Sequence, residues 1–357
     1  MLPLTLQVDR RLYGCPRYYF GQDGDLMRVP DIVRTCVAFL SYQSKKLEQL
    51  RFAGTAFFVH YPMDEFVVAG YVVTARHVIE DIQIASTDDK AILRVNEMGG
   101  GLIRIDTNCD DWFFHPTDSN VDVAVMPISF RGRQVNQNFL STAAFATAAA
   151  SSARIGIGEE VFITGLFTSH FGKKKNIPIV RVGNIAAMPD EPIKTKLGLV
   201  EGYLIEARSL GGLSGSPVFA LTVEPERPLF DTQQPTTGFW VGGKPARIPT
   251  VPVGAKVEID AEKFAVEVKL PETMVLVPGE HTQSFCLLGL MHGHFDASET
   301  SQTDSVVEDS QGGPVNVGIG VVVPSAKILE VLEHPKLKEM RAKLLDDYEK
   351  SITATPD

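Results

Sequence analysis

Three short segments of the sequence carry residue types that together can perform nucleophilic catalysis. His77 lies in the segment TARHVI, Asp122 opens the apolar run DVAVM, and Ser214 lies in the glycine-rich segment GLSGSP. A serine hydroxyl is a weak nucleophile at neutral pH and must lose its proton to a base as it attacks. An imidazole can take that proton, and a carboxylate on its far nitrogen fixes the tautomer and stabilises the imidazolium. We therefore predict that His77, Asp122 and Ser214 form a catalytic triad for acyl transfer.

The glycines around the serine indicate a second element of the same chemistry. Gly212 and Gly215 flank the dipeptide Leu213-Ser214 and permit a tight turn there. Such a turn can direct the backbone N–H groups of Gly212 and Ser214 at a developing oxyanion. We predict an oxyanion hole formed by these two groups.

The order of the three residues along the chain separates one class of hydrolase from others. Histidine, then aspartate, then serine is the order of chymotrypsin-like enzymes, whereas α/β-hydrolases and subtilisins use other orders. The three motifs, with the later segment LLGLMHG (Leu287–Gly293), resemble trypsin-like serine peptidases of the chymotrypsin fold, especially bacterial members without disulfides. The resemblance covers residues 31–325 apart from an insertion at 222–282. It implies a mainly β protein with two six-stranded antiparallel β-barrels, and a serine endopeptidase that works through an acyl-enzyme.

Two positions depart from the secreted members of that family. Leu213 stands where zymogen-derived members have an aspartate that pairs with a new N-terminus, so activation by N-terminal cleavage is not expected. Val78 stands where they have a disulfide cysteine, which agrees with a reducing compartment.

The resemblance also implies which residues line the specificity pocket. Arg208 lies six residues before the nucleophile, Ser209 is its neighbour, and His292 and Gly293 lie on the later strand. These are the predicted substrate-binding residues. A cationic pocket would favour Glu, Asp or Gln before the scissile bond, because a buried charge needs a partner. If Arg208 points to solvent, the pocket takes small apolar residues instead, and both readings stay open.

The elements that must position these residues are mostly strands. Short Val, Ile and Phe runs separated by Gly, Asp and Asn occupy two stretches of the chain, as expected of antiparallel β-structure. Apolar residues at three- and four-residue spacing after Pro324 predict a C-terminal helix. The expected organisation is an N-terminal extension (1–30), a first barrel with His77 and Asp122 (31–135), a second barrel with Ser214 (136–325) and a C-terminal helix and tail (326–357). The proline-rich insertion at 222–282 interrupts the second barrel, and we expect it to control access or to bind a regulatory partner.

Composition and charge narrow the classes of function. The net charge of −10 argues against binding to nucleic acid, and no stretch approaches the roughly 20 apolar residues of a membrane span. The four scattered cysteines fit reduced thiols in the cytoplasm. His292 and His294 would share one face of a strand, but no third ligand is apparent, so we expect no metal and no cofactor. The expected partner is a protein or peptide substrate.

Two other functions remain possible from the sequence. One is a catalytically inactive trypsin-fold binding module, although an intact triad with its glycines argues against it. The other is an esterase-like hydrolase on the same fold, because the acyl-transfer chemistry is shared.

Overall fold

The computed structural model describes Val29 and residues 32–63, 67–130, 135–146, 155–195, 198–207, 212–223, 238–241, 244–247, 283–296 and 316–353. The chain divides into two units, one made of Met1–Thr222 with Ser284–Asp357 and the other of Val223–Gln283. The described part of the second unit is an antiparallel hairpin of β15 (Gly238–Val241) and β16 (Lys244–Arg247). The rest of the predicted insertion, and the predicted extension up to residue 28, lie outside the described residues. The domain boundaries drawn from the sequence stay a prediction.

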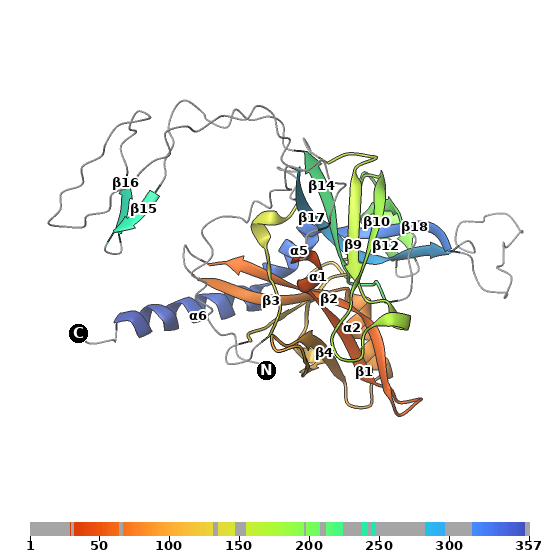
Figure 1. The fold of residues 1–357 in the computed structure, drawn as a ribbon, viewed down its shortest axis with the longest axis horizontal. Coiled ribbons are helices and arrows are strands. Elements are labelled where there is room, and N and C mark those ends of the chain that lie inside the picture. The colour runs from red at the N-terminus through yellow and green to blue at the C-terminus, as the bar shows by residue number, and fades with distance from the viewer. Residues whose placement is uncertain are drawn as a thin grey trace, which may run out of the picture. The chain divides into compact units, whose positions relative to one another are not determined.

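The first sheet of the larger unit lies beside α2 and contains the strands that precede His77 and follow Asp122 (Figure 1). Its strand order is β5-β4-β1-β2-β3-β7-β6, and β8 pairs in parallel with β2 outside this path. The strands are β1 (Val37–Gln43), β2 (Leu50–Pro62), β3 (Val68–Thr74), β4 (Lys90–Asn96), β5 (Leu102–Asn108), β6 (Phe113–Phe114), β7 (Ala124–Pro127) and β8 (Leu140–Ser141).

This sheet is open, which corrects the prediction of two closed six-stranded barrels. To close the ring, one continuous strand from β5 to β6 would have to pair with β4 on one side and with β7 on the other. The two pairings are instead made by separate strands, because β5 pairs only with β4 and β6 only with β7. Between them the 3₁₀ turn η1 (Cys109–Asp111) takes the backbone out of strand conformation, so no continuous ladder closes the ring.

The second sheet is the closed six-stranded antiparallel barrel that the sequence predicted. Its order is β10-β13-β18-β17-β14-β9. The strands are β9 (Glu160–Gly165), β10 (Ile179–Ala187), β13 (Tyr203–Glu206), β14 (Pro217–Val223), β17 (Gln283–Asp296) and β18 (Asn316–Pro324). A separate two-stranded sheet joins β11 (Ile193–Thr195) to β12 (Gly198–Val200). The insertion leaves this barrel after β14 and returns at β17.

Helices lie at the junctions and at the C-terminus. The described helices are α1 (Ile32–Thr35), α2 (Arg76–Ala85), α5 (Ser325–Leu332) and α6 (Pro335–Thr353), with 3₁₀ turns η2 (Thr142–Ala144) and η3 (Thr168–His170). The predicted C-terminal helix is therefore two helices, and the second begins at Pro335, whose fixed φ and missing N–H suit a first helical position. In α6, Leu337 is fully buried and Arg341 donates a hydrogen bond to the Tyr71 hydroxyl of β3 at 3.0 Å. Within the described residues, no helix combines the length and apolarity that a bilayer crossing requires.

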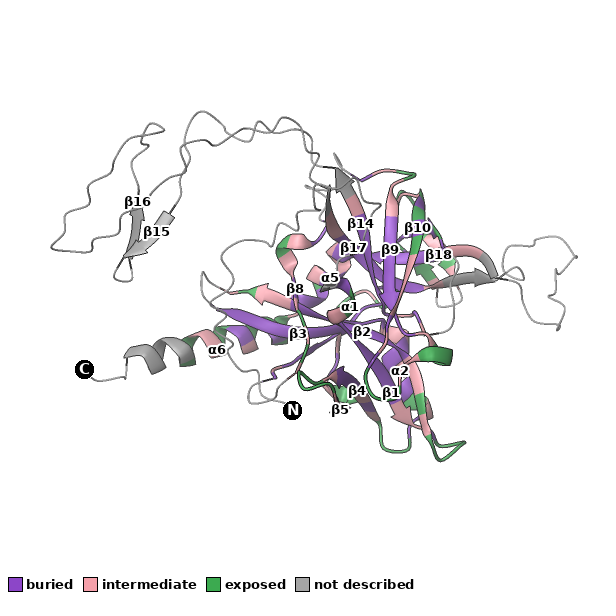
Figure 2. Ribbon diagram, in the orientation of Figure 1, coloured by how far each residue is buried: buried purple, intermediate pink, exposed green. Residues whose placement is uncertain are grey.

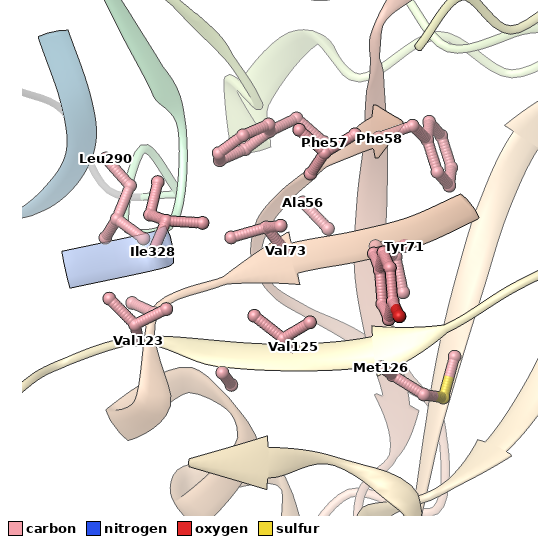
Figure 3. Close-up of a cluster of buried hydrophobic side chains, with 14 of the residues drawn as sticks. Ala56, Phe57, Phe58, Tyr71, Val73, Val123, Val125, Met126, Leu290 and Ile328 are labelled. Atoms are coloured by element: carbon pink, nitrogen blue, oxygen red, sulfur yellow. The ribbon is translucent and has the colours of Figure 1, made fainter. Parts of the chain in front are cut away.

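One hydrophobic core connects the two sheets. The strands at the centre of the larger unit are buried along most of their length (Figure 2). Phe57 of β2, Val73 of β3 and Val125 of β7 pack together, and Leu290 of β17 and Ile328 of α5 join them (Figure 3). Because this cluster includes residues of the first sheet, the second barrel and a C-terminal helix, it fixes the two sheets against each other where the predicted triad is divided between them.

Candidate active site

His77 lies in the first turn of α2, immediately after β3. The first N–H groups of a helix have no partner inside the helix, and the residue at the N-cap, Ala75, provides no side-chain acceptor. The His77 N–H instead donates a hydrogen bond to Oδ1 of Asp122 at 2.9 Å. The carboxylate thus caps the helix from a distant part of the chain, where the helix dipole favours negative charge.

Asp122 is fixed by a tight turn just before β7. The N–H of Val123 donates to the carbonyl of Val121 at 2.9 Å, which closes a three-residue turn centred on Asp122. The side chain is buried, and its Oδ2 accepts a hydrogen bond from Nδ1 of His77 at 2.8 Å. Both carboxylate oxygens therefore bind His77, one through the main chain and one through the ring.

The electrostatics of this pair suit a histidine base. Burial alone would raise the pKa of Asp122, but hydrogen bonds from His292 and His77 outweigh burial and hold that pKa well below its usual range. Burial also opposes the charged form of His77, yet the hydrogen bond and charge of Asp122 outweigh it and raise the pKa of His77 above its ordinary 6.5. An ionised carboxylate only accepts hydrogen bonds, so His77 carries its proton on Nδ1 and leaves Nε2 as the free base.

Ser214 lies in a four-residue turn that depends on glycine. The N–H of Ser216 donates to the carbonyl of Leu213 at 2.9 Å and closes the turn. Gly215, at its third position, has φ of +79°, a conformation that favours glycine. A Cβ on Gly215 would also collide with the Thr74 hydroxyl and the Thr55 carbonyl of the first sheet. The turn is therefore seated directly against β2 and β3.

Thr55 of β2 fastens this turn, and the sequence did not single it out. Its N–H donates to the Ser214 carbonyl at 3.0 Å, and its hydroxyl donates to the Gly212 carbonyl at 2.9 Å. The same hydroxyl accepts a hydrogen bond from the Leu166 N–H at 2.9 Å. The only signal in the sequence is a threonine in the otherwise apolar run GTAFFV, and the structure shows that it is fully buried. Thr55 therefore connects the first sheet to the turn that contains Ser214.

The predicted oxyanion groups lie in the same turn. Gly212 has φ of +102°, and its carbonyl is directed at the Thr55 hydroxyl. Between described residues, the N–H groups of Gly212 and Ser214 donate no hydrogen bond. The oxyanion hole itself stays a prediction.

The Ser214 hydroxyl is held by a neighbouring strand. It donates to the main-chain carbonyl of His292 in β17 at 3.2 Å, and the described residues show no hydrogen bond from Ser214 to His77. The predicted proton transfer to His77 would therefore require the hydroxyl to leave the His292 carbonyl by rotation about the Cα–Cβ bond of Ser214, a change that is fast for a side chain with room to turn.

The predicted pocket residues have different outcomes. Arg208 and Ser209 lie outside the described residues. Gly293 is half-buried in β17, with open space where a side chain would be. The His292 ring, which the sequence placed in the pocket, is buried and directed at Asp122, with Nδ1 2.5 Å from Oδ2.

His77, Asp122 and His292 also form a group whose ligand atoms could hold a metal ion. These atoms lie within 4.8 Å of one another, and the group does not include His294, the residue that the sequence paired with His292. The Asp122 oxygens already accept hydrogen bonds from three N–H groups, however. A cation would have to displace two of them.

The three described cysteines are poor candidates for a nucleophile. Burial raises the pKa of Cys109 and Cys286 to about 11, and it raises the pKa of Cys36 still further. A thiol reacts as its thiolate, so these three groups are unreactive near neutral pH.

Comparison with known proteins gives distant similarities. No family model matches the chain, and no curated protein matches it in sequence. Among solved structures, it is similar to the MamO protease domain of Magnetospirillum magneticum, with 13% identity over 84% of this chain and 96% of that chain, and a TM-score of 0.40.

Two further solved structures are similar at the same level. The Rv3671c protease of M. tuberculosis, in its inactive form, has 14% identity over 84% of this chain and 88% of that chain, with a TM-score of 0.35. Human heparin binding protein has 9% identity over 54% of this chain and 78% of that chain, with a TM-score of 0.34. Because all three TM-scores are below 0.5, what this chain does has to be argued from its own site.

Proposed function

We propose that this chain is a serine endopeptidase of the trypsin-like, chymotrypsin-fold family, of the bacterial type without disulfides. The observation that supports it most is the pairing of His77 with Asp122. The carboxylate binds both the main-chain N–H and the ring Nδ1 of His77, which leaves Nε2 as a base of raised pKa.

The proposed reaction proceeds through an acyl-enzyme. Oγ of Ser214 attacks the carbonyl carbon of the scissile bond as its proton passes to Nε2 of His77. The negative oxygen that forms is bound by the N–H groups of Gly212 and Ser214. His77 then gives its proton to the leaving amine, and the C–N bond breaks. A water molecule repeats the sequence on the acyl-enzyme and releases Ser214.

The decisive experiment is covalent labelling followed by substrate profiling. A fluorophosphonate probe should label the wild-type protein at Ser214, and a peptide library should contain cleaved members. Hydrolysis of simple esters without cleavage of any peptide would favour the esterase-like alternative. Cleavage after Glu, Asp or Gln would fit a pocket lined by Arg208, and cleavage after small apolar residues a pocket without it. Cleavage mainly after Lys or Arg would contradict both.

A second candidate function is an inactive binding module on the same fold. The contact that favours it is the hydrogen bond from the Ser214 hydroxyl to the His292 carbonyl, which holds the hydroxyl away from His77. A folded protein that resists the probe under all conditions, and that cleaves no library member, would establish this alternative.

The insertion at 222–282 is proposed to govern access to the site or to bind a regulatory partner. The support is its place in the chain, directly after the strand that follows Ser214 and directly before β17. Replacing residues 225–280 by a short linker should leave hydrolysis of small peptides measurable and change cleavage of proteins. Equal cleavage of a protein substrate by both forms would contradict this role.

We also propose that the protein works in the cytoplasm on protein or peptide substrates, without metal, cofactor, nucleic acid or membrane. Cys36, Cys109 and Cys286 are free thiols, and the first two are buried. Thiols that never need to pair fit a reducing compartment. Fractionation of source cells would test this, and recovery of the protein outside the cytoplasm would contradict it.

A further inference from the structure

His292 touches both halves of the candidate site through different parts of the same residue. Its ring is buried against Asp122, with Nδ1 2.5 Å from Oδ2. Its main-chain carbonyl accepts the hydrogen bond of the Ser214 hydroxyl at 3.2 Å. The neighbouring residue Met291 is bonded to the nucleophile turn in both directions, through Gly215 N–H to Met291 O and Met291 N–H to Ser216 O, each at 2.8 Å. Strand β17 is therefore a rigid support for the serine and for the carboxylate.

One oxygen of Asp122 serves two imidazoles. Oδ2 accepts from Nδ1 of His77 at 2.8 Å and from Nδ1 of His292, and the two rings lie 5.5 Å apart with their planes inclined at 75°. A carboxylate oxygen has the lone pairs for two donors, and an ionised carboxylate has no hydrogen to give. Both histidines therefore carry a proton on Nδ1. The carboxylate cannot turn toward one ring without losing the other.

We propose that His292 is a positioning residue that holds Asp122 through its ring and the Ser214 hydroxyl through its carbonyl. This rests on the proposed peptidase function, because the residue acts through the predicted triad. Its ring does not replace His77 as the base. Its ring shares the negative charge of Asp122 and so limits how strongly that charge stabilises the His77 imidazolium.

The proposal has a signature that simple packing would not produce. Within the described part of the chain, the titratable groups around His77 are Asp122, His292, and Glu80 and Asp81 of its own helix. If the second donor on Asp122 is removed, the carboxylate interacts more strongly with His77 alone, and the pKa of His77 rises further. At the same time Asp122 loses one of its restraints, so the rate falls at every pH. A merely structural role would lower stability without moving this pKa.

The variants separate the ring's hydrogen bond from its bulk. His292→Phe keeps a ring of similar shape without a donor, whereas His292→Asn keeps an N–H near the place of Nδ1. All variants retain the main-chain carbonyl that holds Ser214. We expect the rate of fluorophosphonate labelling to fall about 10-fold or more in H292F, as for loss of a hydrogen bond to a charged group. We also expect the labelling rate of H292F to fall off at a higher pH on acidification than that of the wild type. H292N should restore both the rate and this pH toward wild type.

A readout independent of activity separates failure of this proposal from failure of the proposed function. In the inactive Ser214→Ala background, NMR titration of the His77 ring should give a higher pKa with H292F than with His292. If H292F does not fold, His292→Ala and H292N are titrated in its place. An unchanged His77 pKa in a folded variant without the donor, or a folded H292N that behaves as H292F does, would overturn the proposal. Wild-type protein that never labels would overturn the peptidase function and leave the titration to decide the role of His292.

Discussion

The two halves of the candidate site are held in different ways. On the first sheet, the side chain of Asp122 accepts three N–H groups, and one of them belongs to the start of α2. On the second barrel, the Ser214 side chain makes a single hydrogen bond among the described residues, while main-chain bonds and Thr55 hold its turn. The difference matches the work of each half. In the proposed reaction the base must keep one orientation throughout, whereas the nucleophile must rotate toward it.

The largest effect should come from the side chain that is least restrained. Ser214→Ala removes the proposed nucleophile and should lower peptide cleavage by about 10⁶-fold, because loss of the triad serine removes most of the catalysis. Since only one hydrogen bond is lost, the melting temperature should change little. Labelling, cleavage and thermal unfolding measure the three quantities.

The matched control for this variant is the next serine along the turn. Ser216 is fully buried, and its hydroxyl makes no hydrogen bond within the described residues, so Ser216→Ala should keep its activity. If S214A cleaves nearly normally, or if S216A loses activity as S214A does, the assignment of the nucleophile is wrong.

Asp122→Asn should affect both catalysis and folding, unlike the serine variant. An amide has one acceptor oxygen instead of two, so its NH₂ group must face either the His77 N–H or the two ring N–H groups, and kcat should fall by about 10⁴-fold. The free energy of unfolding should fall by about 1–3 kcal/mol, because buried donors lose their acceptor and α2 loses its cap. Denaturant unfolding measured beside S214A sharpens the comparison. Equal stability of the two variants would show that the carboxylate does not hold the fold.

Thr55→Val breaks the connection between the two halves. It keeps a β-branched side chain and the N–H bond to Ser214, but it leaves the Gly212 carbonyl and the Leu166 N–H without their partner. We expect a 10- to 100-fold loss in labelling rate and a loss of about 1–3 kcal/mol in stability. Thr55→Ser keeps the hydroxyl and should behave almost as wild type. If T55V and T55S label equally fast, Thr55 does not position the turn.

The charge of His77 should produce a shift along the pH axis. Its pKa is raised above 6.5, so labelling should fall as the pH drops through a midpoint above that value. The free energy of unfolding should depend on pH in the opposite direction to the labelling rate. Protonated His77 stabilises the fold below pH 6.5, and this contribution is lost as the pH rises through the raised pKa. The depressed pKa of Asp122 preserves its contribution until strongly acid pH. A midpoint below 6.5 in the labelling profile would contradict the pairing.

The smallest expected effect is that of chelation. Because the Asp122 oxygens are already occupied by N–H donors, EDTA should leave labelling and stability unchanged. Loss of labelling in EDTA, restored by added Zn²⁺, would instead mean that His77, Asp122 and His292 bind a cation.

The sequence pointed to candidate site residues more readily than to the contacts that hold them in place. His77, Asp122 and Ser214 were recognisable because each lies in a short motif whose residue types have a chemical reason to occur together. The closed second barrel followed from the same resemblance. The open first sheet did not, because Asn108, Asp110 and Asp111 indicate a turn but do not say whether the strands on either side of it complete a closed ring.

Contacts between distant segments were the other limit. The roles of Thr55 and His292 depend on which atoms meet across the two sheets. A threonine in an apolar strand and a histidine beside glycine have no local pattern that specifies a partner far along the chain. The predicted place of His292 in the pocket came from its strand, and a strand alone does not say which face of the site a side chain reaches.

The capping of α2 by Asp122 has a consequence for how such chains would diverge. A residue that closes a helix remains under selection for folding even in a lineage that no longer cleaves anything. The Ser214 side chain carries no comparable duty, so it is free to drift once catalysis is abandoned. In descendants of this protein, an intact histidine and aspartate at positions 77 and 122 would therefore be weak evidence of activity. The residue at position 214 would be the informative one.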